Sequence, residues 1–266
     1  MPFYISGKEL ADQKEIDHVE RVKLLKNKGL VPRLVIIQTK DSSVIDMYVR
    51  AKKKYAEKIG VIVEHLTINT DHDLKNTVAR INSDTNIHGA IIQLPLDQHL
   101  DQDETLNLIA KNKDVDGLST DSIYIPPTAQ AIFWLMEKHI GDFATKKIAL
   151  VGKGRLVGAP LLSLFQSKNI YPQVFIKGDN ISKLLGYNVI ISATGVPGLI
   201  LSEHIVPGVF LFDAGTAEEN GSIHGDASDE LYERSDIHIT PIKGGVGILT
   251  VRALFENVIQ AAEKLL

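Results

Sequence analysis

The stretch that decides the fold reads Ile148-Ala-Leu-Val-Gly-Lys-Gly-Arg-Leu-Val-Gly-Ala-Pro160. Its apolar run, 148–151, predicts a buried strand, and residues 159–166 predict a helix that tolerates proline in its first turn. Three glycines connect the two elements. A strand, a glycine turn and a helix bring backbone N–H groups and a helix N-terminus towards a phosphate, so the stretch predicts a nucleotide site.

The residues around this turn favour NADP over NAD. The spacing is G-x-G-x-x-x-G, one residue longer than the dinucleotide fingerprint, so an ordinary strand–helix turn with surface lysines stays open as the alternative. A second predicted strand, 173–176, ends in Lys177, where an NAD site more often places an acidic residue for the ribose 2′-OH. With Lys153 and Arg155 in the turn, Lys177 indicates a 2′-phosphate.

Composition limits the class of protein. The 266 residues suffice for two domains or one large one, and 44% hydrophobic residues predict a packed core. A net charge of −4 argues against nucleic acid as the main partner. The absence of cysteine excludes disulfides, thiolate catalysis and cysteine zinc sites. No signal peptide and no membrane-spanning run is evident, so we expect a cytoplasmic protein without a membrane partner.

Strands and helices alternate along the whole chain. The alternation predicts an α/β protein with parallel sheets, and the turn-rich, proline-containing region 114–127 predicts a linker between two lobes. Strands are expected at 34–38, 61–68, 88–96, 148–151, 173–176, 189–193, 209–213 and 237–240. Helices are expected at 8–28, 71–82, 103–111, 128–139, 159–166 and 249–266. A further helix is expected to run to about residue 59 from an N-cap at 41, 42 or 43.

Four polar residues from separate elements could meet in a site. Tyr48 and Lys52 are four apart on a predicted helix and share a face. Gln93 ends the third strand, where open α/β sheets bind ligands, and Asp116 lies in the predicted linker. A lysine held in a partly closed cleft can act as a base. The alternative interpretation of Arg50-Ala-Lys-Lys-Lys54 is a solvated basic helix face.

A second glycine cluster, Pro241-Ile-Lys-Gly-Gly-Val-Gly247, follows the last predicted strand. Three glycines in four residues indicate backbone that approaches a ligand closely, and a mobile hinge is the alternative. The histidines lack the helical spacing of a metal site, and no G-x-S-x-G nucleophile motif occurs. We therefore expect no metal.

Taken together, these segments resemble the bifunctional methylenetetrahydrofolate dehydrogenase/methenyltetrahydrofolate cyclohydrolase family. They occur in the family's order and span almost the whole chain, and Gln-Leu-Pro-Leu followed by Asp-Val-Asp-Gly is a specific pair. The matching segments are Tyr48-Val-Arg-Ala-Lys52, Gln93-Leu-Pro-Leu96, Lys113-Asp-Val-Asp-Gly117, residues 152–160, Ala193-Thr-Gly195 and Ile239-Thr-Pro-Ile-Lys-Gly-Gly-Val-Gly247.

The resemblance implies a role for each matching residue. Lys52 would move the proton in the cyclohydrolase step, Gln93 would bond to that lysine, and Tyr48 and Asp116 would hold the folate and complete the catalytic set. Substrate-binding positions would be Tyr48, Lys52, Gln93, Leu94, Pro95, Asp116, Gly244, Gly245 and Gly247. Positions contacting NADP would be Gly152, Lys153, Gly154, Arg155, Val157, Gly158, Lys177, Thr194, Gly195 and Thr216.

The resemblance also implies an architecture and a biological role. A folate-binding α/β lobe, 1–119, would be joined by the C-terminal helix 249–266, and a Rossmann-type NADP lobe would comprise 120–248. The family usually forms a homodimer through the nucleotide domain, and it serves one-carbon metabolism for purine and amino-acid synthesis. Some positions depart from the family pattern, among them Ile45, Gly154 and Lys243.

Three other functions stay open on sequence alone. One is a two-lobed dehydrogenase of another small substrate, such as shikimate, although Gln93-Leu-Pro-Leu96 argues against it. Another is a non-catalytic folate- or nucleotide-binding relative, although such a protein has no need of Lys52 and Gln93. The third is a family member that retains only one of the two activities.

Overall fold

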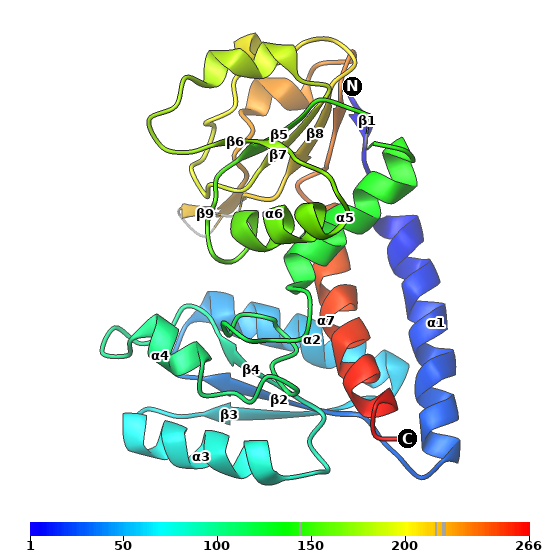
Figure 1. The fold of residues 1–266 in the computed structure, drawn as a ribbon, viewed down its shortest axis with the longest axis vertical. Helices are drawn as coiled ribbons and strands as arrows, with labels where there is room; N and C mark the ends of the chain where they lie inside the picture. Colours follow the sequence, from blue (N-terminus) through cyan, green and yellow to red (C-terminus); the bar gives the residue numbers. More distant parts are fainter. Residues whose placement is uncertain (144, 216, 220–221) are drawn as a thin grey trace. The chain divides into compact units, whose positions relative to one another are not determined.

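The computed structural model describes residues 1–143, 145–215, 217–219 and 222–266, and divides into two compact units (Figure 1). Residues 12–127 and 251–266 form the three-stranded unit. Residues 1–11 and 128–250 form the six-stranded unit. Both sheets are parallel and carry helices, so the predicted two-lobed α/β fold is confirmed.

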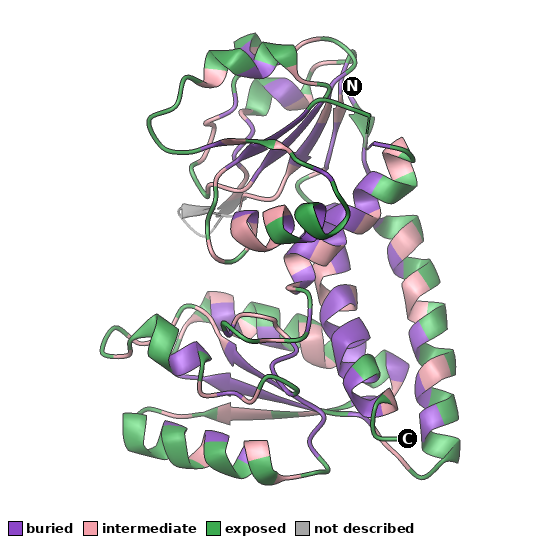
Figure 2. Ribbon diagram, in the orientation of Figure 1, coloured by how far each residue is buried: buried purple, intermediate pink, exposed green. Residues whose placement is uncertain are grey.

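The three-stranded unit is built on strand β2 (Arg33–Gln38), which lies between β3 (Ile62–Thr67) and β4 (Gly89–Gln93). Alternate residues of β2 enter two separate apolar clusters, as the period of a strand requires. One cluster includes side chains of helices α2 (Ser43–Ile59) and α7 (Val246–Glu263), and the other includes α3 (Asp71–Ser83). Figure 2 shows β2 buried between these layers.

Helix α1 (Lys8–Asn27) and helix α7 are each divided between the two units. The boundary falls after Ala11 in α1 and after Thr250 in α7. The last part of α7 places Leu254, Phe255 and Val258 in the core of the three-stranded unit. The predicted return of the C-terminal helix to the first lobe is therefore confirmed. The first eleven residues, which the sequence analysis placed in the first domain, cluster instead with the six-stranded unit.

The helix predicted over 103–111 is too long. Helix α4 (Gln102–Leu106) ends early, and turns follow it. Asn82 explains the shortening, because its side chain donates to the carbonyl oxygen of Leu108 at 2.8 Å and accepts from the amide of Ala110 at 2.9 Å. The side chain of Asn82, which lies on α3, thus binds backbone groups that would otherwise have continued the helix.

The six-stranded unit is one parallel sheet in the order β1-β11-β8-β7-β5-β6. Helices α5 (Pro127–Ile140) and α6 (Gly158–Ser167) contribute to its core, in which Phe133, Phe143 and Phe165 pack together. The strands are β1 (Phe3–Tyr4), β5 (Ile148–Val151), β6 (Gln173–Phe175), β7 (Val189–Ser192), β8 (Phe210–Asp213) and β11 (His238–Ile239). Smaller elements are the hairpin β9 (Ala217–Glu219) and β10 (Ser222–His224), and the 3₁₀ helices η1 (Ile181–Gly186), η2 (Ser202–His204) and η3 (Asp229–Tyr232).

Strand β1 was not predicted, because it has only two residues and no alternating pattern. It pairs with β11 from the other end of the chain, and the amides of Phe3 and Ile5 donate to the carbonyl oxygens of Ile237 and Ile239. Such a strand exists only through its non-local partner. None of the helices described is both long and apolar enough to cross a membrane.

Candidate functional site

Lys52 and Gln93 meet at the carboxyl end of the three-stranded sheet. Lys52 lies on α2, and its Nζ donates to Oε1 of Gln93, the last residue of β4, at 2.5 Å. The Gln93 amide nitrogen donates to the carbonyl oxygen of Leu94 at 2.9 Å. Because that bond holds the amide nitrogen, the amide oxygen faces the lysine. The structure therefore brings together the pair that the sequence analysis grouped.

Lys52 and Asp116 form an electrostatic pair. Burial lowers the pKa of the Lys52 ammonium group, and the negative charge of Asp116 opposes that change. Burial raises the pKa of Asp116 to about 6, Lys52 lowers it and Asp114 raises it further. Desolvation penalises the charged form of each group, so the lysine loses its proton more readily than an exposed one. Burial thus acts on both groups of the pair in the direction that disfavours their charges.

Tyr48 stands one helical turn before Lys52 on α2 and is 37% exposed. Leu94 is half-buried and Pro95 is exposed, directly after Gln93. All of these residues lie at one edge of the three-stranded unit. The other residue of interest on this helix, Ile45, is fully buried in the apolar core. The departure from the family pattern at this position thus contributes to packing.

The loop that carries Asp116 is held on several sides. Asp114 accepts hydrogen bonds at 2.8 Å from both the amide and the hydroxyl of Ser119. A Cβ on Gly89 would lie 2.7 Å from Val115, so only glycine allows the loop to pack on β4. Asn257 of α7 donates to the carbonyl oxygen of Val115 at 2.9 Å. The sequence analysis did not identify these supporting residues, because they act on the backbone of the loop.

Replacing Asp116 by asparagine should stabilise the protein at alkaline pH. The pKa of about 6 exceeds the unfolded value of about 3.9, so the fold holds this proton more tightly than the unfolded chain does. The stabilisation from that proton is present below about pH 4 and is lost as pH rises through 6. We expect Asp116→Asn to raise the free energy of unfolding by about 3 kcal/mol at pH 8, with little gain at pH 4.

Denaturant unfolding at the two pH values measures this difference. Asp121→Asn is the matched control, because Asp121 is exposed and lies in the same segment of the chain. An Asp116→Asn variant that is less stable than wild type at pH 8 would show that the carboxylate is held by favourable contacts that outweigh its burial.

The glycine turn in the six-stranded unit has the geometry of a nucleotide-binding turn. Gly152 follows β5 with φ of 95°, a conformation that favours glycine, and a Cβ on it would lie 2.6 Å from the carbonyl oxygen of Ala193. A Cβ on Gly158, the first residue of α6, would overlap the carbonyl oxygen of Gly152. Gly154 is exposed and has open space around it. Two of the three glycines are therefore needed for close backbone approach.

The other residues that were expected to contact the cofactor lie near the carboxyl ends of β5 and β7. Lys153 is exposed, and Arg155 and Val157 are half-buried in the turn. Thr194 is half-buried and Gly195 is exposed, just after β7. Thr216, which was expected to contact the cofactor, lies outside the described residues.

Lys177 occupies a tight turn after β6. Asp179 closes this turn, because its carboxylate accepts from the Ile176 amide at 2.7 Å and its amide donates to the Ile176 carbonyl oxygen at 3.0 Å. Gly178 has φ of 100°, which the turn requires. Lys177 is exposed at this turn. It is thus presented to solvent two residues after β6, which ends at Phe175, one residue earlier than predicted.

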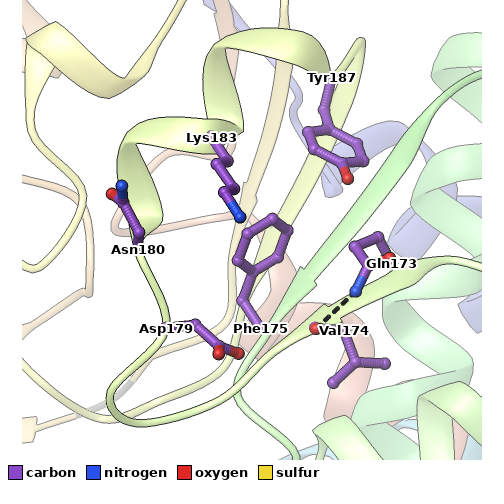
Figure 3. A pocket seen from close by; sticks show the side chains of 7 residues that line it. All are labelled: Gln173, Val174, Phe175, Asp179, Asn180, Lys183 and Tyr187. Carbon is purple, nitrogen blue, oxygen red and sulfur yellow. Dashed lines mark hydrogen bonds between the residues drawn. The ribbon is translucent and has the colours of Figure 1, made fainter.

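A pocket of about 340 Å³ lies beside β6 and η1 (Figure 3). Phe175 and Tyr187 contact edge to face in it, with ring centroids 5.7 Å apart. Its lining is Gln173, Val174, Phe175, Asp179, Asn180, Lys183 and Tyr187. Neither Lys177 nor the glycine turn lines this pocket, so the predicted cofactor residues do not form it.

The second glycine cluster follows β11. Gly244 has φ of 85°, and its carbonyl oxygen accepts from the Gly7 amide at 2.8 Å. Gly245 is buried, and a Cβ on it would lie 2.7 Å from the carbonyl oxygen of Pro241. Gly247 is exposed in the first turn of α7, and Lys243 is exposed beside the cluster. The close packing of Gly245 requires glycine, whereas Gly247 has open space.

One group of described residues has the spacing of metal ligands. Asp17, His18 and Glu256 have ligand atoms within 4.8 Å of one another. Glu256 also accepts from Arg21 at 2.7 Å, and the fully buried His18 bonds through Nδ1 to the Tyr55 hydroxyl at 2.8 Å. These cations and hydrogen bonds already satisfy the group, which therefore joins α1, α2 and α7 as a polar network.

Comparisons with known proteins cover both units. Residues 5–116 match the model of the tetrahydrofolate dehydrogenase/cyclohydrolase catalytic domain, and residues 126–266 match the model of the NAD(P)-binding domain of the same family. A Lactobacillus acidophilus protein named bifunctional protein FolD is 32% identical over 274 residues, covering 98% of this chain and 97% of its own length.

Solved structures give the same result. The bifunctional FolD enzyme from Campylobacter jejuni has a TM-score of 0.90 and 29% identity, and the match covers 100% of both chains. The Trypanosoma brucei enzyme, solved with NADP and an inhibitor, has a TM-score of 0.89 and 26% identity over 99% of this chain and 98% of its own. With both family models matched in order along this fold, the chain belongs to the tetrahydrofolate dehydrogenase/cyclohydrolase family.

Proposed function

We propose that the chain oxidises 5,10-methylenetetrahydrofolate to the 5,10-methenyl form with NADP and then hydrolyses that product to 10-formyltetrahydrofolate. The observation that carries the proposal is the Lys52–Gln93 hydrogen bond beside Asp116, in the part of the chain that matches the catalytic domain. The glycine turn in the NAD(P)-binding match supports the dehydrogenase half. This reaction belongs to one-carbon metabolism.

The residues of the six-stranded unit fit a dinucleotide. The backbone of the Gly152 turn, up to Gly158 at the start of α6, would face the pyrophosphate, because the Ala159 amide already donates to the carbonyl oxygen of Gly154 and Pro160 has no N–H. The close packing of Gly158 leaves no side chain in the way. NADP, when bound, supplies the hydride acceptor. Hydride transfer depends on alignment more than on acid–base help, so these residues act by holding the two reactants in register.

Lys52 would carry the proton transfers of hydrolysis. Water attacks the bridging carbon of the methenyl cation, and the neutral amine of Lys52 takes the proton that the water loses. The bond from that carbon to N5 then breaks: the lysine returns a proton to N5, and the hydroxyl group left by the water loses its remaining proton to solvent as it becomes the carbonyl of the formyl group on N10. Burial lowers the pKa of Lys52 and so favours the neutral amine that this step requires. Tyr48 and Asp116 would hold the folate, with Asp116 at the polar edge of the pterin.

Other positions would complete the substrate contacts. Leu94 and Pro95 follow Gln93 directly, and we propose that they border the bound folate. We propose that the second glycine cluster also contacts the folate, because glycines leave the backbone accessible to a ligand. Its members are Gly244, Gly245 and Gly247. These assignments rest on the match of each residue to the family's motifs.

Lys177 should favour NADP over NAD. It is exposed at the end of β6, where a 2′-phosphate on the adenine ribose would be met by a basic residue. We expect Lys177→Ala to raise KM for NADP about tenfold and to leave KM for NAD unchanged, since a charge-assisted bond contributes about 1.5 kcal/mol. Initial rates with both cofactors measure the change.

Lys168→Ala is the control for this variant, because Lys168 is an exposed lysine at the end of α6 in the same unit. Equal loss of affinity for NADP and NAD in Lys177→Ala would mean that the residue supports the turn and does not read the 2′-phosphate.

We also propose a cytoplasmic homodimer that associates through the six-stranded unit. Strand β6 is at the edge of its sheet, so its outer hydrogen-bonding groups have no neighbouring strand among the residues that the structure describes. Light scattering of the purified protein gives the mass, and a monomer at micromolar concentration would contradict this assembly.

An absorbance assay tests the function. Purified protein is incubated with 5,10-methylenetetrahydrofolate and either NADP or NAD, and the methenyl product is followed before and after acid treatment. Reduction of NADP without methenyl accumulation supports both activities. Accumulation of the methenyl form indicates that hydrolysis is lost despite Lys52. No turnover of methylene or methenyl substrate would favour a non-catalytic binding relative.

A further inference from the structure

Asp226 is a buried carboxylate that binds the segment after β7. It follows the β9–β10 hairpin in the chain and is 0% exposed. Its Oδ2 accepts from the Ser192 hydroxyl at 2.6 Å and from the Thr194 amide at 2.7 Å, and its Oδ1 accepts from the Val196 amide at 3.0 Å. One side chain therefore fixes alternate residues over a stretch of five.

Asp213 holds Asp226 in turn. This last residue of β8 accepts from the amides of Asp226 at 3.0 Å and Ala227 at 2.9 Å, and its own amide donates to the Thr240 hydroxyl at 2.8 Å. A Cβ on Gly215 would overlap the Asp226 carboxylate, and one on Gly225 would overlap that of Asp213. The two carboxylates are thus enclosed by backbone, which supplies the donors that they need in place of water.

The segment that Asp226 fixes packs against the nucleotide turn. The Ala193 amide donates to the carbonyl oxygen of Val151 at 2.8 Å, at the end of β5. A Cβ on Gly152 would lie 2.6 Å from the Ala193 carbonyl oxygen and 3.1 Å from Cγ2 of Thr194. A shift of this segment would therefore displace the Gly152 turn, which is proposed to hold the pyrophosphate.

Asp226 also determines which backbone donor this segment can offer. The amides of Thr194 and Val196 are taken by its carboxylate, and Pro197 has no N–H. Within the described part of the chain, the Gly195 N–H has no hydrogen-bond partner, and Gly195 is exposed with φ of 68°. The donor that the segment leaves available is therefore that of Gly195.

We propose that Asp226 is a positioning residue of the dehydrogenase: it holds residues 193–196 so that the Gly195 N–H meets an acceptor oxygen of the bound dinucleotide. This inference rests on the proposed function, because it takes NADP as the molecule held by the Gly152 turn. Asp226 acts through Gly195 and does not itself contact the cofactor.

The chemistry of the contacts requires a carboxylate. A carboxylate only accepts hydrogen bonds, and the partners of Asp226 include two backbone amides, which only donate. An asparagine of the same shape would turn its own NH₂ group towards one of these amides. The segment would then lose a bond and move, although the volume of the side chain is unchanged.

Asp226→Asn tests the proposal with two kinds of measurement. Hydrogen–deuterium exchange of the Thr194 and Val196 amides is expected to become more than tenfold faster, without a matching change in the β5 amides. KM for NADP is expected to rise about tenfold and dehydrogenase kcat to fall, while hydrolysis of methenyltetrahydrofolate stays within twofold of wild type. Unchanged exchange of the β5 amides shows that the six-stranded unit of the variant is folded, because β5 and Asp226 belong to that unit.

Ser192→Ala removes one of the bonds to Asp226 and serves if Asp226→Asn does not fold; we expect a smaller rise, about threefold, in KM for NADP. Asp229→Asn, an exposed neighbour in η3, is the control. Unchanged NADP kinetics in both test variants, with or without faster exchange, would overturn the proposal. Wild-type protein that neither binds nor reduces NADP would instead contradict the proposed function, and the exchange data would still report whether Asp226 holds the segment.

Discussion

Lys52→Ala is expected to lower the rate of methenyltetrahydrofolate hydrolysis about a thousandfold and to leave hydride transfer within about tenfold of wild type. Hydrolysis removes a proton from water and returns one to N5, and Lys52 is the amine that the structure places on Gln93 beside Asp116. Hydride transfer requires no proton at this position. The loss in the dehydrogenase should therefore come only from poorer placement of the folate.

The two rates can be measured separately. Hydrolysis is followed from added methenyltetrahydrofolate, and hydride transfer from reduction of NADP with the methylene substrate. Lys54→Ala is the matched control, because Lys54 is an exposed lysine on the same helix and its removal leaves the Lys52–Gln93 bond in place. An equal loss of both rates in Lys52→Ala would contradict the proposed division of labour.

Gly158→Ala is expected to raise KM for NADP at least about thirtyfold, which corresponds to about 2 kcal/mol of binding free energy. The added methyl group would overlap the Gly152 carbonyl oxygen and would lie 2.9 Å from its carbonyl carbon. Helix α6 must then move away from the turn, and the donors at its N-terminus move with it. We also expect the free energy of unfolding to fall by about 1–3 kcal/mol.

Gly186→Ala is the matched control, since Gly186 lies in the same unit with ordinary φ and has no atom within 4 Å of an added Cβ. Hydrolysis of methenyltetrahydrofolate should remain in Gly158→Ala, because the residues proposed to carry it belong to the three-stranded unit. Titration with NADP, followed by fluorescence, gives the affinity of each variant. Wild-type affinity of Gly158→Ala for NADP would contradict this prediction, because it would show that the turn accommodates the added methyl group without moving the residues that bind NADP.

Much of the secondary structure follows from local pattern. Helix α2 was predicted to end at Ile59, and it does so because Gly60 takes the left-handed conformation that ends a helix. The apolar runs of β2, β5 and β7 identified them as strands because strands covered on both faces contain almost no polar residues. Where competing contacts come from elsewhere in the chain, as Asn82 does at α4, local pattern was misleading.

The proposed site, too, could be predicted from the sequence only in part. Tyr48 and Lys52 share a helix face, and Gln93 ends a strand, so their positions at one edge of the sheet could be expected from the sequence. The order of the motifs was enough to identify the family, which the comparisons confirm. The pKa values of Lys52 and Asp116 could not be predicted, because they depend on how far each group is removed from water.

The sequence by itself determined the α/β class, the two parallel-sheet lobes and the family, because periodicity, glycine spacing and motif order are local properties of a chain. Only the tertiary structure showed which hydrogen bonds hold the functional segments. These are the bonds between Asp114 and Ser119, between Asn257 and the carbonyl oxygen of Val115, and between Asp226 and residues 192–196. Such a buried acceptor has no pattern of its own in the sequence. Its partners are donors far along the chain, and only folding brings them within hydrogen-bond distance.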